Sequence, residues 1–204
     1  MGFLSPDSGF MRGLSDLADA IWINMLMLVT GLPLVTIGAA LSAGHYAARR
    51  SLQGRGHVTA DFFHAFRVEF MQSTCIWLIL GPIGCLLICG WLLVRVPLLL
   101  IPGFALGLLW AIVFEWVWSL QAGFENTVLR TMLNALVIGV VNWPRTAALV
   151  VMDLAYLLLL AVCWLRLPQG LFLLVVLGYG TLVMLHTPIQ KPTLDRYRTG
   201  NSQS

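Results

Sequence analysis

Charged residues are scarce in this sequence. Only 10% of its 204 residues are Asp, Glu, Lys or Arg, whereas 59% are hydrophobic. An ordinary soluble domain carries about 25% charged residues, so this chain is too poor in charge to cover a water-facing surface in the usual way. This hydrophobic composition excludes a soluble enzyme domain, a disordered tail and a nucleic-acid-binding module. In addition, a formal net charge of +3 is too small for a phosphate-binding surface.

Catalytic and metal-binding motifs are also missing. The chain has no Walker lysine and no G-x-S-x-G element, and its four cysteines form no C-x-x-C pair. Cys85 and Cys89 share one helix face by spacing and are expected to pack as small buried side chains. The four histidines form no helical H-x-x-x-H pair. The sequence therefore predicts no enzymatic activity, no cofactor and no metal site.

Five long apolar runs dominate the sequence. They occupy residues 17–41, 74–94, 97–120, 146–164 and 168–186. About 20 apolar residues suffice for a helix to cross a bilayer, so the pattern predicts an all-α polytopic membrane protein. We expect one membrane domain with five transmembrane helices embedded in the lipid bilayer, followed by a cytoplasmic tail over residues 187–204.

The basic residues predict an orientation. Nine of the twelve Lys and Arg lie between the first and second runs, between the third and fourth runs, and in the C-terminal tail. Arg12, Arg95 and Arg166 are on the other side. Because basic residues favour the cytoplasm, the C-terminus is expected inside and the N-terminus outside. The outer connections at residues 95–96 and 166–167 are very short, so partners are expected on the cytoplasmic side.

Two segments between the runs are predicted to form cytoplasmic amphipathic helices. In the first, Phe62, Phe63, Phe66 and Phe70 follow the spacing of one helix face, with Arg67 on the other. This pattern is typical of a partner-binding or lipid-sensing helix, or of a helix that lies in the interface or packs beneath the bundle.

The second predicted amphipathic helix covers residues 125–136. Its polar stripe and its apolar stripe are Asn126, Arg130 and Asn134, and Leu129, Leu133 and Leu136. Glu125 at its start is favourable for the helix dipole. Together with the phenylalanines and Arg67, the residues Glu125, Arg130 and Asn134 are the candidate partner-facing positions.

Several short elements occur together in one order along the chain. They are Asn24, L-P-L-V-T-I-G-A-A at 32–40, D-F-F at 61–63, A-F-R at 65–67, F-E-N at 124–126, N-A at 134–135 and W-P at 143–144. In this order the chain resembles the YesL-like family of bacterial membrane proteins, over about residues 10 to 190.

That resemblance implies about five spanning helices in the bacterial cytoplasmic membrane. Members of the family are often encoded beside ATP-driven sugar importers and glycoside hydrolases. The resemblance therefore implies an accessory protein that supports or regulates carbohydrate uptake, with permease or ATPase subunits or a second copy of the chain as partners. It brings no catalytic residues.

The segment after the third run is also similar to the coupling helix of importer permeases in one respect. Glu125 and Pro144 have the separation found there between a glutamate and a proline. Asn126, Thr127 and Thr131 replace the two alanines and the glycine of that motif.

Polar residues inside the apolar runs are candidate functional residues, because they are costly in lipid. Glu115 and Asp153 are expected about 10 Å from the cytoplasmic end of their helices, from the helical rise. They either share a proton or a donor, as in a small transporter or channel, or act separately. Asn24 is expected to donate to a neighbouring helix, for about 1 kcal/mol.

Overall fold

The computed structural model describes residues 9–54, 57–93 and 97–201. Within these ranges the regular structure is entirely α-helical, which confirms the predicted fold class. The helices are α1 (Gly9–Gly31), α2 (Ile37–Ser51), α3 (Val58–Val68), α4 (Phe70–Leu93), α5 (Pro97–Gln121), α6 (Val128–Val141), α7 (Trp143–Arg166) and α8 (Pro168–Asn201). The predicted outer connection at residues 95–96 lies outside the described residues.

Five helices are long and apolar enough to cross a membrane. They are α1, α4, Ile101–Gln121 of α5, α7 and Pro168–Arg198 of α8. The protein is therefore a multi-pass membrane protein. The last four coincide closely with apolar runs predicted from the sequence, and the connection between α7 and α8 is as short as expected.

The first predicted span differs from the structure. The apolar run over residues 17–41 is divided between two helices, with a turn between Gly31 and Ile37. Pro33 has no amide hydrogen to donate, and Leu34 has a φ of 47°, a left-handed conformation that does not continue a helix. The sequence prediction of one continuous helix is therefore wrong, and α2 packs against α1.

Two hydrogen bonds show that, after the turn, the chain returns along α1. Ser51 Oγ, at the end of α2, donates to Asp19 Oδ2 at 2.5 Å. Trp22 Nε1 donates to Thr59 Oγ1 of α3 at 2.8 Å. The start of α3 and the end of α2 therefore lie beside the middle of α1.

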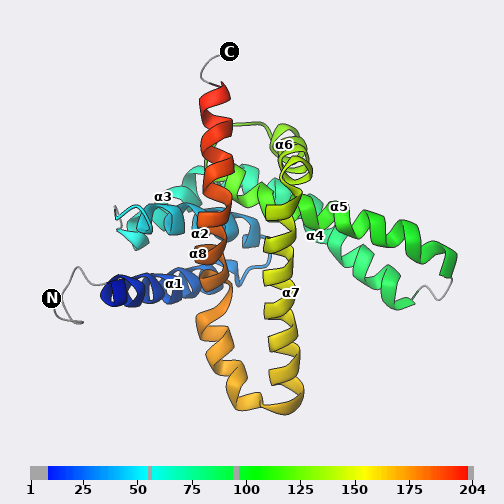
Figure 1. Ribbon diagram of the computed structural model, residues 1–204, viewed down its shortest axis with the longest axis horizontal. Coiled ribbons are helices and arrows are strands. Elements are labelled where there is room, and N and C mark those ends of the chain that lie inside the picture. Colours follow the sequence, from blue (N-terminus) through cyan, green and yellow to red (C-terminus); the bar gives the residue numbers. More distant parts are fainter. Residues whose placement is uncertain (1–8, 55–56, 94–96, 202–204) are drawn as a thin grey trace.

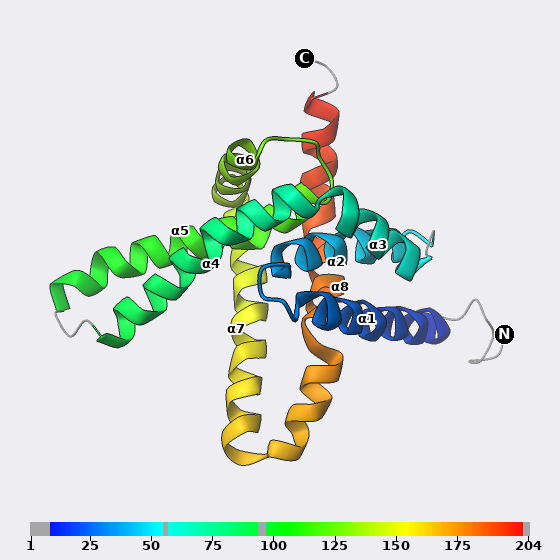
Figure 2. The ribbon, with the colours of Figure 1, turned by 180° about the vertical axis from the view of Figure 1, so that it is seen from behind.

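The long helices diverge from a shared centre (Figures 1 and 2). The α4–α5 hairpin and the α7–α8 hairpin point in different directions, and α1 extends in a third. The largest fully buried side chains of the centre include Trp116, Trp118, Phe62 and Ile76. Away from it, side chains such as Leu93 and Phe172 are exposed. Lipid is as apolar as these side chains, so the outer parts of the long helices can expose them to the bilayer without contact to other protein elements.

Glycines allow the close approach of α4 and α5. A Cβ at Gly107 would lie 2.6 Å from Trp91 Cζ2, and one at Gly84 would lie 2.7 Å from Trp110 Cζ2. The G-x-x-x-G element that ends at Gly107 therefore serves packing within the chain. Cys85 and Cys89 are exposed on α4, so the prediction that they are buried is wrong.

The C-terminal segment is a continuation of α8. The helix runs on to Asn201 through Pro188 and Pro192, so residues 187–201 extend the last span as a helix. Residues 202–204 lie outside the described part. A kink occurs earlier in α8, where Gly178 has φ 49° and ψ −165°, a conformation that is essentially restricted to glycine.

Candidate functional site

Three ionisable side chains from three helices meet near the centre of the molecule. Glu115 is on α5, Asp153 on α7 and His186 on α8. One ligand atom from each lies within 4.8 Å of the other two. The arrangement is a compact polar group inside an otherwise apolar region, and we call it the carboxylate–histidine cluster.

The two ring nitrogens of His186 face different carboxylates. Nε2 lies 3.3 Å from Asp153 Oδ1, and Nδ1 lies 3.8 Å from Glu115 Oε2. The side chains of His186 and Glu115 are almost completely buried, at 1% and 5% exposed, and that of Asp153 is 18% exposed. Asp153 is thus the member through which the cluster reaches the surface.

Four polar atoms of the cluster are buried without a hydrogen-bond partner. These are the two nitrogens of His186, Glu115 Oε2 and Asp153 Oδ1. Buried polar atoms in folded proteins are nearly always satisfied, and each unsatisfied group costs about 1–3 kcal/mol. Four such atoms in one compact group therefore indicate a place for a bound species.

The helix backbone around the cluster is held by Gln190, one turn beyond His186. Its Nε2 donates to the carbonyl oxygen of Glu115 at 2.8 Å, whereas its Oε1 is buried without a partner. This bond links α8 to α5 at the level of the cluster. In the described part of the chain, neither Glu115 nor Asp153 forms an ion pair with an arginine or lysine.

A cavity of about 280 Å³ adjoins the cluster. Glu115, Asp153 and Tyr179 contribute polar groups to its wall, and the remaining wall is apolar or aromatic. Leu154 and Leu157 also line it and are exposed, so the cavity opens to the outer surface of the helices.

The sequence predicted two members of the cluster and missed the third. Glu115 and Asp153 were expected at a common depth, and the structure brings them together. His186 was set aside because only histidine pairs on one helix were considered. Its partners are carboxylates on two other helices, so the one available signal was a histidine near the end of an apolar run.

Asn24 is a structural residue of α1 at the kink of α8. Its Nδ2 donates to the carbonyl oxygens of Val175 at 2.8 Å and Val176 at 3.0 Å, and its Oδ1 accepts from the Gly180 amide at 3.3 Å. The side chain therefore bonds with backbone groups on both sides of Gly178. This agrees with the expected donation to a neighbouring helix.

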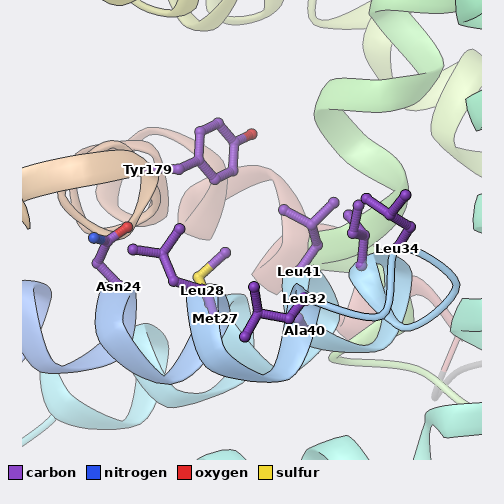
Figure 3. A pocket seen from close by; sticks show the side chains of 10 residues that line it. Asn24, Met27, Leu28, Leu32, Leu34, Ala40, Leu41 and Tyr179 are labelled. Carbon is purple, nitrogen blue, oxygen red and sulfur yellow. The ribbon is translucent and has the colours of Figure 1, made fainter. Parts of the chain in front are cut away.

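A second cavity, of about 360 Å³, lies between Asn24 and the α1–α2 turn. Figure 3 shows Asn24 and Tyr179 on one side of this cavity, with Met27, Leu28 and Leu41 beside them. Tyr179 lines both cavities, so it stands between the apolar cavity at the turn and the cavity at the cluster.

The first predicted partner-facing helix, α3, buries Phe62 and Ala65 and exposes much of the rest of its surface. Phe62 is fully buried and its ring stacks on that of Phe66 at 6.2 Å between centroids, whereas Phe63 is 39% exposed. Arg67 is exposed near the end of α3. The structure therefore assigns Phe62 to the core and corrects its prediction as a partner contact.

The second predicted helix begins later than expected, at Val128, with Thr127 as its N-cap residue. Glu125 precedes the helix, and both Glu125 and Arg130 are exposed, whereas Asn134 is half-buried. The side of α6 that packs inward carries Thr131, Ala135, Ile138 and Gly139. The leucines at 129 and 133 are exposed, so the predicted apolar stripe faces outward.

Three titratable groups outside the candidate spans have shifted pKa values, and one of them is Arg49, whose pKa is lowered mainly by burial. Burial lowers the pKa of His45 on α2 from 6.5 to about 3, with smaller contributions from His186 and Arg49. Burial also raises the pKa of Glu69, between α3 and α4. Gln121 Nε2 donates to Glu69 Oε2 and to Gln72 Oε1, which partly offsets the burial of the carboxylate.

Comparison with protein families gives one match. Residues 20–91 match the family described as "Protein of unknown function, DUF624", which includes the YesL-like membrane proteins. The match confirms the YesL-like resemblance over these residues, which cover the second half of α1, all of α2 and α3, and most of α4. No curated protein and no solved structure matches the chain.

Proposed function

We propose that this YesL-like chain is an accessory membrane protein that supports carbohydrate uptake by binding subunits of an ATP-driven importer. The family match supports the class of protein. The observation that carries the proposal is the unpartnered apolar face of α6, which lies at the end of the molecule where many basic residues collect.

The apolar face of α6 is formed by residues one turn apart. Leu129 is 68% exposed, Leu133 53% and Val137 60%. Arg130 and Asn134 follow the leucines on the same helix. A helix of 14 residues is too short to cross a bilayer, so this face is suited to lie at the membrane edge and to pack against an apolar helix of a partner.

Basic residues surround the same end. Arg145, at the start of α7, donates to Thr193 Oγ1 at 2.5 Å. Arg49 donates to the carbonyl oxygen of Ala122, and Arg198 to that of Gly123 at 3.4 Å, just after the end of α5. We propose that this end faces the bacterial cytoplasm, together with the C-terminus, because basic residues are retained on that side.

The N-terminal end of α1 belongs on the same side in this proposal. The contacts of Asp19 with Ser51 and of Trp22 with Thr59 bring the middle of α1 beside the α2–α3 connection. This revises the sequence-based expectation of an outside N-terminus. Arg12 then joins the cytoplasmic basic residues, which increases the charge difference between the two sides.

Purification from native membranes tests the accessory function. Tagged full-length protein should retain permease or ATPase subunits that mass spectrometry identifies. Leu133→Ser should lower their recovery at least several-fold, since it removes apolar contact area from the centre of the α6 face. Val68→Ser, at an apolar position 66% exposed on α3, is the matched control and should retain them. Wild-type protein that carries no importer subunit contradicts the proposal.

A second candidate function is favoured by the carboxylate–histidine cluster. Intramembrane carboxylates next to a histidine are typical of ion and proton pathways, so an autonomous small transporter or channel is the alternative. Purified protein alone in liposomes would then move a solute or protons, and Asp153→Asn would abolish the flux. An absence of flux from the protein alone excludes this alternative.

A further inference from the structure

We propose that Glu115, Asp153 and His186 form a binding site for a divalent first-row transition-metal ion. The inference goes beyond the accessory function and does not depend on it, because no residue of the α6 face takes part. It also holds whether the ion stays bound or passes through the membrane.

The donor set suits such an ion. Two carboxylate oxygens and one imidazole nitrogen are ligands that Mn²⁺, Fe²⁺ and Zn²⁺ accept. With metal–ligand bonds of about 2.0–2.2 Å, two neighbouring ligand atoms are separated by roughly 3 to 4 Å. One ligand atom from each of the three residues lies within 4.8 Å of the other two. The closest approaches, 3.3 Å to Asp153 and 3.8 Å to Glu115, involve different nitrogens of the His186 ring. Because one ion binds only one nitrogen of an imidazole, the His186 ring or the Glu115 carboxylate must rotate to bring both carboxylates to the same nitrogen.

Unpartnered buried atoms provide the second, independent observation. His186 is 1% exposed at its side chain and donates or accepts no hydrogen bond through either nitrogen. Glu115 Oε2 and Asp153 Oδ1 are unpartnered as well. A histidine that served only to fill the core would leave its nitrogens satisfied by a carbonyl or hydroxyl. Here one free nitrogen faces the Asp153 carboxylate and the other faces the Glu115 carboxylate.

Charge balance also favours a cation. Two carboxylates beside a neutral imidazole would carry two negative charges in an apolar interior, and no arginine or lysine in the described ranges forms an ion pair with them. Uncompensated buried charge is costly. A divalent ion would neutralise both carboxylates.

The surroundings would hold the ligands in place and leave room beside them. Each ligand comes from a different helix, and the bond from Gln190 Nε2 to the Glu115 carbonyl oxygen keeps α5 and α8 in register at this level. The adjoining cavity of about 280 Å³ reaches Glu115 and Asp153. It has room for the water molecules that would complete the coordination of an ion held by three protein ligands.

Manganese binding provides the test. Full-length protein in detergent, stripped with a chelator, is titrated with Mn²⁺ alone and followed by electron paramagnetic resonance. Mn²⁺ is the probe because it prefers carboxylate and water ligands over thiolates, so the four cysteines do not compete. We expect one ion per chain and a rise in thermal stability on binding.

Single substitutions assign the ion to the cluster. His186→Gln, Glu115→Gln and Asp153→Asn should each weaken Mn²⁺ binding by more than about tenfold. His64→Gln and Glu125→Gln change an exposed histidine and an exposed carboxylate and should leave it unchanged. Equal binding in all variants, or no saturable binding by the wild type, overturns the proposal.

Spectroscopy of the wild type covers the case in which a variant fails to fold. X-ray absorption of the Mn²⁺-loaded protein should show oxygen ligands and one imidazole nitrogen. Coordination by oxygen alone would place the ion elsewhere and overturn the assignment.

Discussion

His186 Nε2 lies 3.3 Å from Asp153 Oδ1, across the interface between α8 and α7. On its other side the same ring faces Glu115 of α5 at 3.8 Å. The imidazole thus stands between two carboxylates on helices that diverge elsewhere (Figure 1). The three helices meet at the residues that are most costly to place in lipid, which makes the cluster the candidate functional centre.

Adding a single methyl group at the kink of α8 should destabilise the folded protein. Gly178→Ala should lower the free energy of unfolding by about 1–3 kcal/mol, because its φ of 49° and ψ of −165° are unfavourable for any L-residue. The new Cβ would also clash with the Asn24 side chain. Thermal unfolding in detergent measures the change. Gly90→Ala is the control: a Cβ there meets nothing within 4 Å, so it should be neutral or slightly stabilising.

The pH dependence of stability should report on His45. Its pKa is lowered by burial to about 3, so the folded state holds the neutral ring while the unfolded chain binds a proton below about pH 6.5. Stability contributed by the neutral ring is therefore present above pH 6.5 and is lost as the pH falls toward 3. Melting temperatures between pH 8 and pH 5 should decline less steeply in His45→Gln than in the wild type. Identical slopes would show that His45 does not titrate as described.

Cysteine labelling tests the position of the N-terminal end. In a chain whose native cysteines are replaced by serine, Ser15→Cys on α1 and Gln53→Cys after α2 should react from the same side of the membrane. Both residues are exposed, and Asp19 and Ser51 next to them are hydrogen-bonded. Leu167→Cys, at the α7–α8 connection, should react from the opposite side. Labelling of positions 15 and 53 from opposite sides would contradict this arrangement and support the sequence-based prediction that the N-terminus is outside.

The four later spans could be predicted because length and continuous apolarity are local properties of the chain. The first span was misjudged for a local reason as well. Pro33 was visible within the run, yet the residues on both sides are apolar, so hydropathy alone did not reveal that the chain turns there and returns as α2. The left-handed conformation of Leu34 is a consequence of that turn. The residue types around it do not predict this conformation.

The cluster and the outward face of α6 depended on contacts between helices. His186 lies near the end of its apolar run, and spacing along one helix cannot show that its partners are on α5 and α7. On α6 both sides carry apolar residues, and the small ones, Ala135 and Gly139, pack inward. Small side chains permit close helix approach, and the buried face of α6 carries three small residues, Thr131, Ala135 and Gly139, beside Ile138.

The central claim is that Glu115, Asp153 and His186 act as one unit. A double-mutant cycle of Glu115→Gln and Asp153→Asn, measured by thermal unfolding in chelator-containing buffer, tests it most directly. The account predicts non-additive effects, with a coupling of about 0.5–3 kcal/mol between the two carboxylates. Effects that add to within about 0.5 kcal/mol would show that the two residues are independent and would contradict the account.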